Sequence, residues 1–254
     1  MKRIKHYVLL AVFMTALAVV STACKMDTTA VPAEGRNISY QYSAKALKAD
    51  FAQFRRIIER KTVQLYTDQE ELQKNLHEAE NSINRPMTEL GFYRLLAPIV
   101  ADLKCGHSFL SVSSNFEKHM REDARFFPAE IRIIDGRLFV IADPTDTGLV
   151  PGMEIVSING EKTERIIDII YASVPTDGDD TGRLRYDTER WFASFYYTYV
   201  GSPAVFSLEV REPETTTIRA IEVPAVRDPS LAKTAQGVMH DTANTPWSVS
   251  IEDN

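Results

Sequence analysis

A tight β-hairpin is the feature that most restricts what this chain can fold into. The pair Asp135-Gly136 stands between an apolar run that ends at Ile134 and a second one, Leu138–Ala142. Asp-Gly supplies the positive φ angles of a two-residue turn that joins antiparallel strands. The pattern therefore predicts two neighbouring strands in the middle of the chain, and with them a sheet.

Other short patterns extend this sheet on both sides of the hairpin. Phe109 and Leu110 predict the start of a strand, and Gly152–Ile158 predicts another, followed by the turn Asn159-Gly160. A helix is expected from Thr163 through Ile170, and a last strand pair at 206–210 and 218–223. Residues 109–226 are thus predicted to form a small mixed domain.

Helical periodicity marks the segment before the sheet. Apolar residues recur at helical spacing from Leu47 to Ile58, and Thr67 with Glu70 has the arrangement of a capping box. A third helix is expected to begin near Thr88 and to end at Gly106, a residue that can cap a helix in the left-handed conformation. Residues 43–108 predict a small helical bundle, and the whole chain an α+β fold.

The first residues have the three parts of a secretory signal. A basic start is followed by an apolar run and by small residues up to Ala23, which predicts a signal peptide over residues 1–23. Cys24 directly after Ala23 resembles the lipidated cysteine of bacterial lipoproteins. We expect a lipid on Cys24, a tether over 24–42 and a position on the periplasmic or extracellular face of the cell envelope. Plain secretion with a free Cys24 is the alternative.

The charge of the chain argues against nucleic acid as a partner. The formal net charge is −6, and removal of the three basic residues of the signal makes it about −9. A protein that binds a polyanion needs a basic stripe, whereas the Lys and Arg residues here alternate with Asp and Glu.

Two motifs, in the same order, carry a family resemblance. The string LVPGMEIVSINGEKTERII resembles the segment of PDZ domains that reads G-D-E-I-L-x-I-N-G and then enters a helix. Before it, two helical segments joined by Pro-Met-Thr lead to Gly106-His107-Ser108. Together these motifs resemble the front half of the tail-specific, or C-terminal processing, serine peptidases, a helical bundle followed by a PDZ-like domain.

This resemblance implies a role for His107 and also a missing partner for it. In the tricorn-like branch of the family, a histidine in the equivalent turn is the general base that takes a proton from the nucleophilic serine. That serine lies in a catalytic core after the PDZ-like part, and residues 227–254 are too few to hold such a core. We therefore expect residues 227–254 to be the start of that core, and the chain to be the recognition half of an envelope peptidase, inactive by itself.

The resemblance also implies a groove for an unstructured peptide or a protein C-terminus. In this groove the peptide would add as a further strand to the edge of the sheet. The candidate residues for binding it are Glu130, Ile131 and Ile133. The loop that should capture a terminal carboxylate reads Phe126-Phe-Pro-Ala129, and Pro128 has no N–H to donate.

Two alternatives remain open from the residues alone. The chain could be a non-catalytic PDZ-like binding module of the envelope, or a self-contained hydrolase built around His107. Cys105 is expected to be small buried filler. We expect no cofactor and no metal site, because the histidines have no ligand-like spacing.

The lipid anchor is testable by one substitution. Because Cys24 is the only cysteine directly after the apolar run, Cys24→Ala should move the protein from the membrane fraction to the soluble fraction. Fractionation with palmitate labelling measures this. A mutant that still sediments with membranes, together with an unlabelled wild type, would contradict the lipoprotein assignment.

Overall fold

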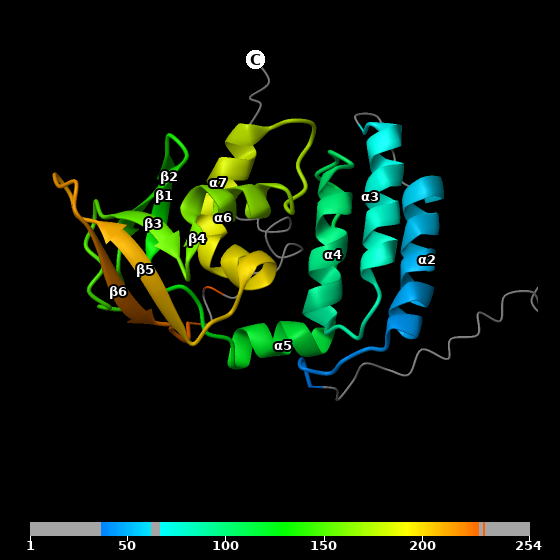
Figure 1. The fold of residues 1–254 in the computed structure, drawn as a ribbon, viewed down its shortest axis with the longest axis horizontal. Helices are drawn as coiled ribbons and strands as arrows, with labels where there is room; N and C mark the ends of the chain where they lie inside the picture. The colour runs from blue at the N-terminus through cyan, green and yellow to red at the C-terminus, as the bar shows by residue number, and fades with distance from the viewer. Residues whose placement is uncertain (1–36, 62–66, 229–230, 232–254) are drawn as a thin grey trace, which may run out of the picture. The chain divides into compact units, whose positions relative to one another are not determined.

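The computed structural model describes residues 37–61, 67–228 and 231, which have the predicted α+β fold (Figure 1). The signal peptide, Cys24, residues 24–36 of the tether and most of the tail lie outside these residues. Within them, no helix is both long and apolar enough to cross a membrane.

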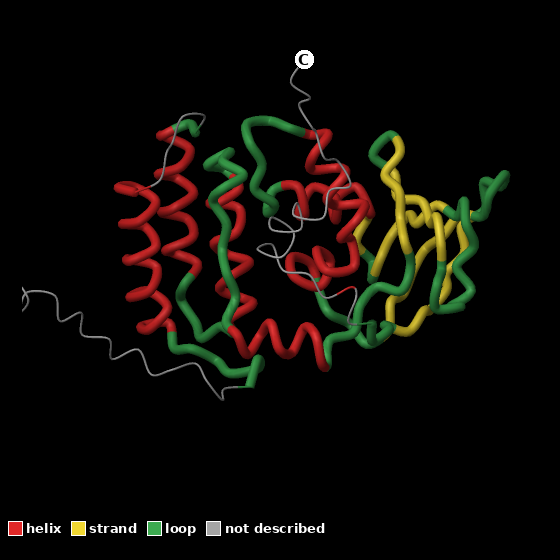
Figure 2. The backbone as a smooth tube through the Cα atoms, turned by 180° about the vertical axis from the view of Figure 1, so that it is seen from behind, coloured by secondary structure: helices red, strands yellow, loops and turns green. Residues whose placement is uncertain are grey.

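Three helices, α2 (Ala44–Lys61), α3 (Gln69–Ser82) and α4 (Glu89–Ala101), lie side by side (Figures 1 and 2). Their facing apolar side chains form one hydrophobic cluster, which includes Leu47, Phe51, Ile58, Leu72, Leu76, Ile83, Leu96, Ile99 and Leu103. Most of the predicted apolar positions therefore form the packing face of the bundle, but Ile57 is exposed.

The ends of two helices differ from the prediction. Asp68, not Thr67, caps α3, because its carboxylate accepts hydrogen bonds from the N–H groups of Glu70 and Glu71. Helix α4 begins after Thr88 as expected but ends at Ala101, and the positive φ of 50° belongs to Lys104 and not to Gly106.

The strand predicted to begin at Phe109 is absent, and a loop and a short helix follow α4 instead. Phe109 and Leu110 lie in a loop, and α5 (Ser114–Glu122) follows it. The Ser113 hydroxyl caps α5 by accepting from Phe116 N–H at 3.2 Å, and Ser113 itself donates to the Glu89 carboxylate. The cap and the Phe116/Met120 pair thus favour a helix over a strand.

The sheet is antiparallel throughout. Its strands are β1 (Glu130–Ile134), β2 (Arg137–Ala142), β3 (Glu154–Ile158), β4 (Glu161–Lys162), β5 (Val205–Arg211) and β6 (Ile218–Pro224). They pair in the order β1-β2-β3-β5-β6, with β4 on β3. The predicted turn is confirmed, with φ of 50° at Asp135 and 75° at Gly136. This order leaves β1 and β6 at the two edges.

Helices α6 (Thr163–Tyr171) and α7 (Thr181–Phe195) and the π-helix η2 (Tyr196–Val200) lie between the sheet and α4 in both views (Figures 1 and 2). They bring a set of aromatic side chains into the larger hydrophobic cluster, Phe192, Phe195, Tyr196, Tyr197 and Tyr199. This aromatic stretch therefore packs the interior.

One arginine joins the helical part to the sheet part. The Arg94 guanidinium of α4 donates to the carbonyl oxygens of Thr198 at 2.7 Å and of Tyr197 at 2.8 Å. These carbonyls belong to the last turn of η2, where backbone acceptors lack partners within the helix. His119 of α5 adds a ring-nitrogen contact of 2.9 Å to the Tyr197 hydroxyl.

Replacing Arg94 should destabilise the fold measurably. Arg94→Met keeps much of the aliphatic length but removes both donors, and we expect a loss of about 2 kcal/mol in the free energy of unfolding. Urea denaturation of the full chain measures it. Arg56→Met, on the exposed side of α2, is the matched control and should change stability by less than about 0.5 kcal/mol. Equal effects of the two substitutions would contradict the linking role of Arg94.

Candidate functional site

The loop that carries His107 is held against a second loop far along the chain. Gly178 N–H donates to the Lys104 carbonyl at 2.9 Å, and Gly106 N–H donates to the Asp177 carboxylate at 2.8 Å. The Lys104 ammonium also lies 2.7 Å from the Asp179 carboxylate. The loop after α4 and the loop between α6 and α7 therefore meet at defined backbone positions.

Gly106 lies where these two loops approach closely. A Cβ atom at this position would lie 3.2 Å from the carboxyl carbon and both carboxylate oxygens of Asp177. A side chain here would therefore require the Asp177 side chain to shift by a few tenths of an ångström. Gly106 thus leaves room for the Asp177 carboxylate and does not form the helix cap that the sequence predicted.

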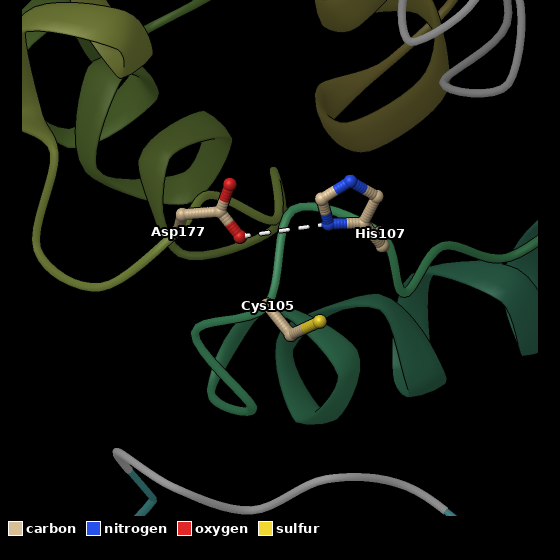
Figure 3. Close-up of side chains that lie close together, drawn as sticks. All are labelled: Cys105, His107 and Asp177. Atoms are coloured by element: carbon tan, nitrogen blue, oxygen red, sulfur yellow. Dashed lines mark ion pairs between the residues drawn. The ribbon is translucent and has the colours of Figure 1, made fainter.

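Cys105, His107 and Asp177 converge in this region (Figure 3). His107 Nδ1 lies 3.9 Å from Asp177 Oδ1, and one ligand atom from each of the three residues lies within 4.8 Å of the others. The His107 and Asp177 side chains are exposed, and Cys105 is half-buried. The expectation of no ligand grouping came from histidine spacing alone, which cannot reveal a carboxylate 70 positions away from His107.

The predicted role of His107 as a general base needs a nucleophile on one ring nitrogen and an orienting group on the other. Among residues 37–61 and 67–228, no serine hydroxyl forms a hydrogen bond with this ring. The Cys105 thiol and the Asp177 carboxylate both lie toward the Nδ1 side of the ring (Figure 3). A Cys-His-Asp relay is therefore not assembled here, and the general-base role stays a prediction.

The predicted peptide groove runs along the edge strand β1. Glu130 is exposed, but the side chains of Ile131 and Ile133 are buried, so only their backbone groups are available at the edge. The Ile134–Arg137 pair closes the hairpin, and the alternation of antiparallel pairs then turns the N–H groups of Ile131 and Ile133 outward.

Helix α7 occupies part of this edge. Its Glu189 carboxylate accepts from Ile133 N–H at 3.0 Å and from the Arg132 guanidinium at 3.0 Å. The Glu189 side chain is only 10% exposed. No local sequence pattern predicts this contact, because it joins residues 56 positions apart.

A cavity of about 550 Å³ opens beside the β1–β2 turn. It is bordered by β1 and the turn, by α6 and by the start of α7, and its lining includes Ile133, Asp135, Glu164, Asp168, Tyr171 and Arg185. Three carboxylates against one guanidinium make it acidic. Burial raises the pKa of the Tyr171 hydroxyl, and the nearby Arg185 partly opposes this. Tyr171 is therefore a neutral hydroxyl at the cavity wall.

The loop before β1 is closed to a terminal carboxylate at two of its positions. Phe126 N–H donates to the Val226 carbonyl at 2.7 Å, and Pro128 has no N–H. All residues from Phe126 to Ala129 are buried.

The chain matches no protein-family profile and no curated protein sequence. The geometry of the two sites therefore carries the functional argument.

The Glu189 contact predicts a specific hydrogen-exchange result. Glu189→Ala removes the acceptor of Ile133 N–H, so exchange at this amide should accelerate by roughly tenfold or more, the equivalent of losing one hydrogen bond to a charged group. Amide-resolved exchange by NMR measures it, with Glu161→Ala on β4 as the control. Unchanged exchange at Ile133 would mean that something other than Glu189 protects this edge.

Proposed function

We propose that this chain recognises extended peptide segments at the β1 edge, as the recognition part of an envelope serine-peptidase system of the tail-specific type. The observation that carries the proposal is the edge strand itself, whose outward Ile133 N–H bonds a side-chain acceptor beside an open cavity. Such an edge accepts an added strand through main-chain hydrogen bonds.

A bound peptide has to displace the Glu189 carboxylate and part of the packing of α7 against β1. Its carbonyl oxygen would take the place of the Glu189 carboxylate at Ile133 N–H, a like-for-like exchange of acceptors. The displaced Glu189 keeps its partner Arg132, so the carboxylate is not left without a cation. This ion pair is therefore kept when the edge opens.

The cavity selects the chemistry of the peptide. Asp135, Glu164 and Asp168 outnumber Arg185, so a lysine or arginine side chain is the preferred occupant. Terminal carboxylate capture is disfavoured, because Phe126 N–H is already used and Pro128 has none. We therefore propose an internal, basic segment of an unfolded protein as the ligand in preference to a free C-terminus.

Location and catalysis follow from the sequence resemblance alone. We propose that lipid on Cys24 anchors the protein at the envelope surface, close to unfolded secreted proteins. We assign peptide recognition to the chain and no hydrolysis of its own, since the described residues supply His107 without a hydrogen-bonded nucleophile.

Charge reversal in the cavity tests the proposal. The full-length protein in detergent is titrated into a fluorescent, unstructured peptide with a central lysine, and fluorescence polarisation gives the affinity. Asp168→Lys replaces attraction by repulsion and should weaken binding by about tenfold or more, whereas Glu161→Lys, an identical charge change on β4 outside the cavity, should leave it unchanged.

Mass spectrometry of the recovered peptide should find it intact. A wild type that does not bind the peptide, or equal weakening by the two substitutions, would contradict recognition at this edge. Cleavage that is lost in His107→Ala would favour the self-contained hydrolase instead.

A further inference from the structure

We propose that Cys105, His107 and Asp177 form a Zn²⁺ site, separate from the peptide edge. The three side chains offer a thiolate sulfur, the imidazole Nδ1 and a carboxylate oxygen, all within 4.8 Å of one another (Figure 3). Tetrahedral zinc with bonds of about 2.0 to 2.3 Å places its ligand atoms about 3.3 to 3.8 Å apart. The cluster therefore needs to contract by only about an ångström to hold the ion.

The donor set identifies the class of metal. Calcium and magnesium take oxygen ligands, whereas a thiolate combined with an imidazole selects zinc among the common redox-inert cations. Sulfur, nitrogen and oxygen donors in one tetrahedron also match the three-ligand zinc sites that keep a fourth position open. That fourth position would hold water or an exchangeable ligand.

The direction of the donors favours a metal over a proton relay. Asp177 lies against Nδ1 of His107, and the Cys105 thiol lies toward the same side of the ring (Figure 3). A relay requires its acid and its nucleophile at opposite ring nitrogens, but metal ligation requires all donors to converge on one point. The observed arrangement has the second property.

Contacts within the protein position the ligands of this site without a bound ion. The Gly106 N–H holds Asp177 Oδ1 at 2.8 Å, and this is the oxygen that lies 3.9 Å from His107 Nδ1, so the backbone positions the carboxylate beside the imidazole. The ammonium of Lys104, the nearest cation on this loop, is paired with Asp179. The His107 and Asp177 side chains are exposed and can make the remaining adjustment by rotation.

Metal titration of the full-length protein in detergent tests the proposal. Isothermal titration should detect one Zn²⁺ per chain, and Co²⁺ as a spectroscopic probe should give a thiolate-to-cobalt charge-transfer band that excess Zn²⁺ removes. Cys105→Ser should abolish this band, and His107→Ala and Asp177→Asn should each weaken Zn²⁺ binding by tenfold or more. Asp179→Asn, an acidic neighbour outside the cluster, should bind as the wild type does.

Two controls make the outcome decisive. His107 is so exposed that its replacement leaves the fold intact, which urea denaturation of each variant verifies. Absence of Zn²⁺ uptake by the wild type contradicts the site, as does a cobalt band that survives in Cys105→Ser. If Asp179→Asn and Asp177→Asn lowered the affinity for Zn²⁺ equally, the loss would reflect the general surface charge and not ligation. That result would also overturn the proposal.

Discussion

The contact between Arg94 and the end of η2 is the interaction on which the arrangement of the whole described body depends. A helix end exposes carbonyl oxygens with partial negative charge, and the planar guanidinium satisfies two of them at once. Burial lowers the pKa of Arg94, while weaker interactions with Tyr197 and Tyr196 oppose this, and an arginine in a protein keeps its charge. The bundle and the sheet are thus joined through a half-buried cation.

Helix α7 leads directly into η2, with a kink at Trp191. Arg94 holds η2, whereas Glu189 of α7 covers the β1 edge and the first turn of α7 borders the acidic cavity. The loop before α7 carries Asp177 to the His107 loop. One helix therefore connects the scaffold, the candidate peptide edge and the candidate metal site.

The proposed metal site and the predicted general-base role of His107 exclude each other, because they require the ring proton on different nitrogens. A zinc ion on Nδ1 leaves the proton on Nε2, and a protonated nitrogen cannot accept a second proton from a nucleophile. The base role predicted from the family resemblance thus requires a metal-free His107.

Much of the fold was predictable because its signals are local. Asp135-Gly136 and Thr88 each act within a few residues and are found as expected, and most of the predicted apolar positions of α2 are buried. Helix α5 was missed, because a serine cap and a single apolar pair are weak signals beside an apolar dipeptide. The Glu189–Ile133 and Asp177–Gly106 contacts join residues 56 and 71 positions apart, and only the tertiary fold determines them.

Intermolecular nuclear Overhauser effects in the complex of the isotope-labelled full chain with an unlabelled basic peptide test the central claim most directly. Addition of the peptide as a strand at β1 predicts contacts from its backbone protons to the amide protons of Ile131 and Ile133. Contacts confined to the opposite edge, β6, or to neither edge, would contradict the account.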